Sequence, residues 1–253
     1  MNKTTLKKAL LFTLCILPVA VVGGYFAARY SLQLMDESIL AEGIRQVGSR
    51  EALVALTMVS NAVYAVVCAF FGYLLAAHLG LMRPFRLEKA TALRVALISA
   101  VCAAVFSLDQ WTFGRWAPQL VDYYRDMKGF DLDTWAASIL YGGVIEEVML
   151  RLFVMSLLAL LGWKLFFRKE PRVPARALIA ANILCALLFA AGHLPSTAQF
   201  FGGLTPLLIL RCFLFNGAAG LLFGRFYRKY GIQYAMLAHM LFHVVTRTIW
   251  AFI

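Results

Sequence analysis

Long apolar runs separated by short charged loops dominate this chain from end to end. A helix needs about 20 apolar residues to cross a hydrocarbon core of roughly 30 Å, and seven runs approach that length. These candidate spans cover residues 9–30, 53–79, 91–109, 135–163, 177–194, 206–226 and 231–253. The runs are continuous rather than alternating, which is typical of membrane helices and not of the strands of a membrane barrel. We therefore predict an all-α fold, a polytopic transmembrane helical bundle.

Two segments bear on that count. Residues 115–134 include Trp116, Tyr123 and Tyr124, which suit the headgroup region, so a re-entrant or interfacial eighth element is an alternative there. The first run follows three lysines, as a secretory signal would, but it has no clear cleavage site and leads directly into further apolar runs. We expect it to be retained as the first membrane helix.

The charges are shared unevenly among the loops. The chain has 24 Lys and Arg against 13 Asp and Glu, a net charge of +11, and the basic residues gather at the N-terminus and in alternate loops. The positive-inside rule then predicts a cytoplasmic N-terminus and explains the charge without nucleic acid, which we exclude as a partner. With 62% hydrophobic residues the composition excludes an ordinary soluble domain. A compact chain with this loop pattern suits a bacterial inner membrane.

The cysteines and the absence of repeats limit the organisation further. All five cysteines lie inside apolar runs and none forms a CxxC pair, so the sequence predicts neither a disulfide framework nor a thiolate metal site. No internal repeat or low-complexity tract divides the chain. We predict one integral membrane domain over residues 1–253.

The fourth run carries three ionisable residues, Glu146, Glu147 and Arg151. Charges at the centre of a bilayer are costly and usually functional. Glu147 and Arg151 stand four residues apart and can form an ion pair that holds the helix in place, whereas Glu146 is rotated by about 100°. A structural ion pair explains two of these residues, but it leaves Glu146 available as a base or a ligand.

Three of the four histidines also lie in apolar runs. His193 ends the fifth span, after a glycine that permits close approach of a helix or substrate. His239 and His243 stand four apart on one face of the last span, the spacing of two metal ligands on a helix. Met240 stands where soluble zinc proteases have a glutamate, which excludes that class. Helix packing is the alternative for each histidine, while carboxylates and imidazoles together in a membrane indicate proton transfer or a metal site.

Other polar residues of the apolar runs have simpler explanations. Asn61, Asn182 and Asn216 are expected to form hydrogen bonds between helices. Arg211 is expected to pair with a site carboxylate or to extend towards the interface, and Asp109 to anchor a helix at the interface.

The three motifs together resemble those of the CAAX protease and bacteriocin-processing family, also called CPBP or Abi, whose members are intramembrane proteases. The family pattern is EExxxR, then FxxxH, then HxxxN or a similar residue, each on a separate transmembrane helix. In this sequence the matching residues are Glu146, Glu147 and Arg151, then Phe189 and His193, then His239 and His243. The resemblance covers residues 135–250, which we expect to be the protease-like core. His243 stands where type II CAAX endopeptidases commonly have asparagine, which puts an amide donor in doubt.

The resemblance implies an intramembrane endopeptidase acting on a membrane protein or peptide within the lipid bilayer. Glu146 and His193 would activate a water, and His239 and His243 would stabilise the oxyanion, while the Glu147–Arg151 pair tunes the local potential. A metalloprotease alternative uses the same four residues, Glu146, His193, His239 and His243, as Zn²⁺ ligands, with water in the open position. The sequence leaves the glutamate-type and metal-dependent forms open.

Two further functions remain alternatives. A catalytically silent family member could act as an immunity or scaffold membrane protein, and the replacement of asparagine by His243 leaves that possibility open. A proton-coupled transporter could use the same carboxylate and imidazoles as a relay. That class often has broken helices in matching halves of the chain, and no such pair is evident.

Overall fold

A computed structural model describes residues 3–126 and 128–252, and all of the regular structure within these ranges is helical. The all-α prediction is confirmed. Six helical stretches are long and apolar enough to cross a membrane. They are α1 (Lys3–Gln33), α3 (Arg50–His78), α4 to η1 (Lys89–Arg115), α9 to α10 (Ala175–Phe201), α11 (Pro206–Tyr230) and α12 (Ile232–Phe252). The chain is thus a multi-pass integral membrane protein.

The remaining expected span, 135–163, lies within an unbroken helical run assembled from shorter segments. These are α7 (Leu132–Ala136), the π-helical η2 (Ala137–Glu146) and η3 (Val148–Met155), and α8 (Ser156–Phe166). The run begins where the Asp131 carboxylate accepts a hydrogen bond from the Thr134 amide at 2.7 Å, an N-cap. π-Helical turns are rare and occur frequently at functional sites. Here they occupy the stretch that carries both glutamates.

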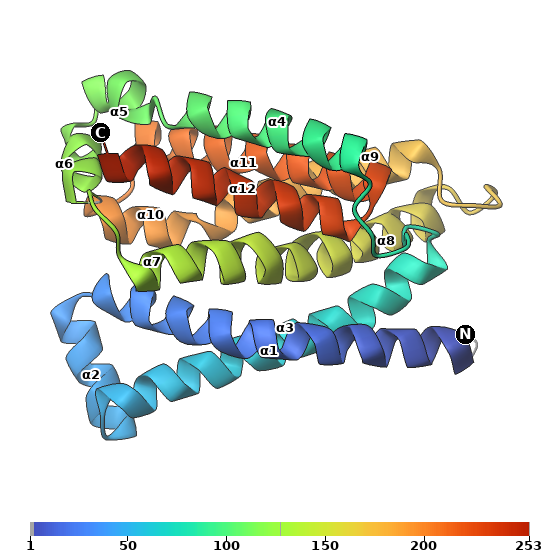
Figure 1. The fold of residues 1–253 in the computed structure, drawn as a ribbon, viewed down its shortest axis with the longest axis horizontal. Helices are drawn as coiled ribbons and strands as arrows, with labels where there is room; N and C mark the ends of the chain where they lie inside the picture. Colours follow the sequence, from blue (N-terminus) through green and yellow to red (C-terminus); the bar gives the residue numbers. More distant parts are fainter. Residues whose placement is uncertain (1–2, 127, 253) are drawn as a thin grey trace.

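This central run lies between two groups of helices (Figure 1). On one side α1 and α3 pack against each other and against η2 and η3, and on the other side α12 contacts η2 while α9 and α11 contact η3. Ile145, Val148 and Leu152 of the central run are completely buried in the main core. The helix with the glutamates is therefore shielded from lipid by neighbours on both sides.

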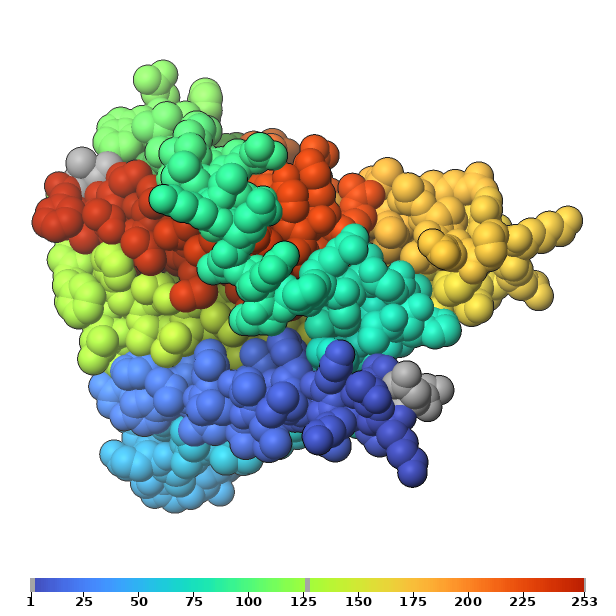
Figure 2. Space-filling model, turned by 45° about the vertical axis from the view of Figure 1, so that its right-hand side comes forward, coloured from blue at the N-terminus to red at the C-terminus, as the bar shows by residue number. Residues whose placement is uncertain are grey.

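The two chain termini lie at opposite ends of the bundle (Figure 1). The N-terminal lysines lie at the same end as the loop between α8 and α9, which projects in yellow in Figure 2 and contains Arg168, Lys169 and Arg172. We call this the N-terminal end and the other the C-terminal end. Basic residues collected at one end are what a cytoplasmic face requires, and the cytoplasmic location of the N-terminus stays a prediction.

Short helices cover the C-terminal end. The segment expected to hold an interfacial element contains α6 (Pro118–Asp126), preceded by α5 (Asp109–Thr112) and η1 (Phe113–Arg115). The nine residues of α6 are too few to cross a bilayer. A further short helix, α2 (Glu37–Val47), connects α1 to α3 and has no buried residue. The cysteines are all free.

Close packing of α3 on the central run depends on Gly72. A Cβ at this position would lie 3.0 Å from the Leu152 carbonyl carbon and 3.0 Å from the Phe153 backbone nitrogen. We expect Gly72→Leu to separate the two helices and to lower the free energy of unfolding by roughly 1–3 kcal/mol. Thermal unfolding of the protein in detergent measures this loss. Gly217→Ala is the control, because nothing lies within 4 Å of a Cβ there; equal midpoints for the two variants would contradict the packing role.

Candidate active site

Glu147 is the fully buried centre of a charged cluster. Its Oε1 atom lies 2.9 Å from Arg151 Nη1, the ion pair expected from the spacing of four residues. The same oxygen lies 2.9 Å from His239 Nδ1, a contact that the sequence did not predict. Because a carboxylate only accepts, the Nδ1 atom of His239 donates and its Nε2 is left for other partners. The pair therefore also orients an imidazole of the third motif.

Arg151 is held on several sides although it is completely buried. Its guanidinium lies 4.7 Å from the centre of the Phe189 ring and 5.4 Å from that of Phe223, and Nη2 donates to the Gly220 carbonyl at 3.3 Å. These contacts join the central run to α9 and α11. They also give the phenylalanine of the second motif a physical role, as a cation–π platform for the buried arginine.

His193 is positioned by its own helix. Its Nδ1 lies 2.8 Å from the carbonyl oxygen of Phe189, so this nitrogen donates and Nε2 is available. The carbonyl of His193 accepts hydrogen bonds from the hydroxyls of Ser196 and Thr197, at 3.0 and 2.8 Å. The backbone thus turns here from α9 (Ala175–Gly192) into α10 (Leu194–Phe201) with its polar groups satisfied.

The two histidines of α12 stack on each other. Their ring centres are 4.7 Å apart, and His239 also stacks on Phe223 at 4.4 Å. His243 fits because residue 142 is a glycine: a Cβ there would lie 2.8 Å from His243 Nε2. The expected common face of the two histidines is confirmed, and it points at the central run.

One cavity of about 390 Å³ collects the four candidate catalytic residues, because Glu146, His193, His239 and His243 all line it. The carboxylate of Glu146 forms no hydrogen bond or ion pair with any residue that the structure describes. Glu147 and Arg151 lie behind the cavity wall. The two glutamates are therefore separated as the helical rotation predicts, one held in the charged cluster and one facing the cavity.

The remaining candidate was a zinc site. Within residues 3–126 and 128–252 no group of three or more His, Cys, Asp or Glu side chains is arranged to hold a metal ion. The two α12 rings stack face to face, and one His239 nitrogen is already bonded to Glu147. The bonds at Nδ1 leave Nε2 of His239 and of His193 available, as they would be for a catalytic imidazole or for a metal ligand, and zinc binding stays a prediction.

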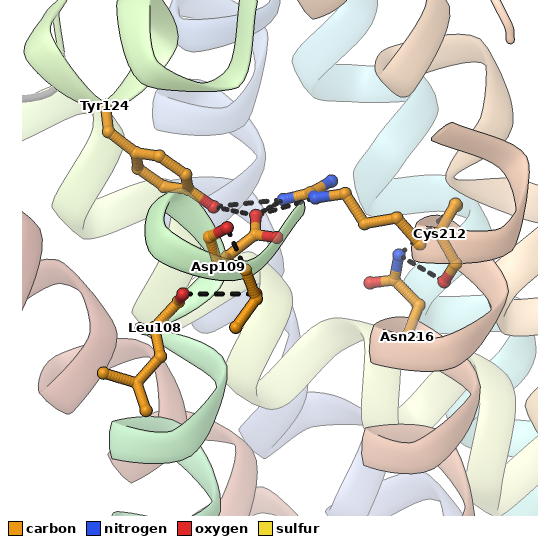
Figure 3. Close-up of polar contacts among 7 residues, drawn as sticks. Leu108, Asp109, Tyr124, Cys212 and Asn216 are labelled. Atoms are coloured by element: carbon orange, nitrogen blue, oxygen red, sulfur yellow. Dashed lines mark hydrogen bonds and ion pairs between the residues drawn. The ribbon is translucent and has the colours of Figure 1, made fainter. Parts of the chain in front are cut away.

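Two residues that line the cavity, Tyr124 and Arg211, form a polar cluster with Asp109, whose expected positions were different; these contacts are drawn in Figure 3. Asp109 is 1% exposed, so it is a buried partner and not an interface anchor. Arg211 Nε donates to its Oδ2 at 2.7 Å and Arg211 Nη2 to the Tyr124 hydroxyl at 3.1 Å, while Tyr124 donates to Asp109. Burial raises the pKa of Tyr124 well above its usual range, so the phenol stays a donor. Arg211 thus pairs with a carboxylate outside the site.

Two of the three asparagines form the expected hydrogen bonds between helices, and the third does not. Asn61 accepts from the Tyr141 hydroxyl at 3.3 Å and Asn182 donates to Leu221 O at 3.1 Å, so both bond between helices. Asn216 instead bonds within α11 and lines the cavity, which the sequence did not reveal. Arg247, one turn after His243, also lines the cavity and donates to Ser138 Oγ at 3.2 Å. The spacing of four residues from His243 was its only sequence signal.

Comparison with known proteins finds a family model that resembles one segment of the chain. Residues 129–245 match the family model described as type II CAAX prenyl endopeptidase Rce1-like. This segment is Rce1-like. It contains all three motifs, so the resemblance to the CAAX protease and bacteriocin-processing family is confirmed over this segment. No curated protein and no solved structure matched the chain.

In the Rce1-like segment, the charged cluster should dominate stability. Arg151→Ala leaves the buried Glu147 carboxylate without its guanidinium, so we expect a loss of about 3–5 kcal/mol in the free energy of unfolding. The double variant Glu147→Gln/Arg151→Met removes both charges and should recover part of that loss. Denaturation in detergent measures both.

The matched control is Arg45→Ala, which breaks an exposed pair with Glu42 and should cost less than about 1 kcal/mol. The role assigned to the cluster is wrong if Arg151→Ala is no more destabilising than this control.

Proposed function

We propose that the protein is an intramembrane endopeptidase that hydrolyses a peptide bond of a membrane-associated substrate by a water activated by glutamate and histidine. One observation carries the proposal: Glu146, without a bonding partner among the described residues, shares a cavity with His193, His239 and His243. The Rce1-like match supports a CAAX-type protease. The loop charges favour a bacterial inner membrane with the N-terminus in the cytoplasm. The three motifs favour residues 135–250 as the protease core.

The proposed reaction begins with water between Glu146 and the free Nε2 of His193. Glu146 takes a proton from the water as its oxygen attacks the peptide carbonyl carbon. The carbonyl oxygen becomes an oxyanion, which a ring N–H of His243 stabilises, and His239 does so as well once its Nε2 has taken up a proton from solvent. Collapse breaks the C–N bond, and the proton held by Glu146 passes to the leaving amine. The products are a carboxylic acid and an amine, and the acid then gives its proton to the amine or to solvent.

The donor arrangement is what this route needs, and a metal-bound form would use the same free nitrogens. His239 Nδ1 is engaged by Glu147, and His193 Nδ1 by the Phe189 carbonyl, so each ring presents one nitrogen to the cavity. Two fixed imidazoles beside a carboxylate can hold and move the protons of one water. Zinc dependence remains the alternative, and metal content distinguishes the two.

The first test uses an internally quenched peptide with the protein reconstituted in liposomes. Because the matching family is described as prenyl endopeptidases, we would offer a farnesyl-cysteine peptide with three following residues and the same peptide unmodified. We expect wild-type cleavage, and a loss of 100-fold or more for Glu146→Gln, His193→Ala and His239→Ala, since general acid–base groups contribute 10²–10⁴-fold.

Glu51→Gln and His78→Ala are the matched controls, because both residues lie outside the cavity lining. They should cleave as the wild type does. Full activity of a folded Glu146→Gln variant would exclude this glutamate as the base. A folded wild-type protein that cleaves neither peptide nor a broader peptide library would favour the immunity or scaffold role.

The second test is metal content by mass spectrometry, on detergent-purified wild type and on His239→Ala/His243→Ala, prepared without chelator. We expect less than one-tenth of an equivalent of zinc in both, on the order of background binding. Near-stoichiometric zinc in the wild type that disappears in the double variant would contradict the metal-free mechanism and make His243 a ligand.

A further inference from the structure

Asn216 lies on the α11 face of the cavity, between apolar and charged lining residues. Its lining neighbours on the same helix are Phe215 and Ala219, with Phe223 nearer His239 and Arg211 at the Asp109 end. Arg211 is committed to Asp109 and Tyr124. Asn216 is therefore the polar side chain that α11 offers to the middle of the cavity.

The orientation of its carboxamide is fixed by hydrogen bonds. Asn216 Nδ2 donates to the Cys212 carbonyl at 3.2 Å and lies 3.4 Å from the Cys212 sulfur. The flipped carboxamide would set two oxygen acceptors against each other, so the nitrogen must face Cys212. Figure 3 shows the result: the oxygen points away from Cys212.

That oxygen is unused by the protein. Oδ1 of Asn216 has no hydrogen-bond donor among the described residues, and it is not sealed in the interior either. It faces the cavity that Asn216 lines. The structure thus places a free, oriented acceptor in the chamber of the candidate catalytic groups.

The anchor of Asn216 extends to the helix of His193. Cys212 is completely buried, and its thiol donates to the carbonyl of Ala190 at 3.2 Å, three residues before His193. The carboxamide is therefore held against both α11 and α9. An acceptor fixed in this way loses little freedom when a ligand binds.

A peptide that enters the cavity brings backbone N–H groups out of water. Each N–H without an acceptor costs about 1–3 kcal/mol. The two arginines that line the cavity, Arg211 and Arg247, are donors and cannot accept from it, and the Tyr124 hydroxyl is already bonded to Arg211 and Asp109. The Oδ1 atom of Asn216 supplies an acceptor for one such N–H.

We propose that Asn216 binds the substrate, with its carboxamide oxygen accepting one backbone N–H of the peptide that is cleaved. This inference rests on the proposed function and deepens it, since it makes a peptide backbone, and not a side chain or a lipid, the group recognised at this position. The residue fixes the register of the peptide against Glu146.

The test compares Asn216→Ala and Asn216→Ser with wild type on the peptide that the wild type cleaves. Serine in a helix can donate to the carbonyl four residues before it, so Asn216→Ser keeps a bond to Cys212 while withdrawing the acceptor from the cavity. Both variants should lose about tenfold or more in kcat/KM, the equivalent of one unpaired N–H. Asn182→Ala, an interhelical asparagine outside the cavity lining, is the control and should keep wild-type kinetics.

A scan of the same peptide with one backbone N-methyl group at a time separates contact from structure. At one position the methyl group should reduce kcat/KM about tenfold for wild type but have no further effect on Asn216→Ser, because that N–H has already lost its acceptor. At the other positions the methyl group should affect both proteins equally. Equal effects at every position, or unchanged kinetics of the folded Asn216 variants, would overturn the inference.

The two proposals fail in different ways. If the wild type cleaves no peptide, the proposed function fails before Asn216 is tested. If wild type cleaves and Glu146→Gln does not, while Asn216→Ser behaves as wild type, the proposed function stands and the inference about Asn216 is wrong.

Discussion

A carboxylate and a guanidinium sealed inside a membrane protein must satisfy each other, and the rest of this bundle is arranged around that constraint. Glu147 and Arg151 are both fully buried, and neither could remain charged there alone. Their remaining contacts recruit Phe189 from α9, Gly220 from α11 and His239 from α12. Each of these contacts ties another helix to the central run. The positions of the candidate catalytic histidines are thus consequences of how one ion pair is accommodated.

The parts of the structure that follow from local periodicity could be predicted from the sequence. Apolar runs locate the spans, and a spacing of four residues gives both the Glu147–Arg151 pair and the shared face of His239 and His243. The rotation between successive residues separates Glu146 from Glu147. Each of these depends only on the geometry of one helix.

Partners chosen across helices could not be predicted in the same way. The Glu147–His239 contact joins residues 92 positions apart, and Asp109 and Arg211 are separated by 102. Which side chains meet at such distances depends on helix order and crossing angle, which no local pattern specifies. The same limit applies to Asn216. Its bond to Cys212 lies within one helix, but its place in a cavity depends on residues of other helices. The resemblance to the family motifs identified the four cavity residues by analogy, but it did not predict these contacts.

The cavity is also closed at one end. Its lining reaches Tyr30 and Trp250 near the C-terminal end, whereas Leu152 and Met155, which follow the glutamates on the central run, are completely buried in the main core. Hydrolysis consumes water, and water that reaches Glu146 brings protons with it. Because these buried apolar side chains pack the central run beyond the glutamates, they oppose the passage of solvent towards the N-terminal end. If the proposed hydrolysis takes place here, this packing would let water enter the interior of the membrane protein while limiting the leakage of protons across it.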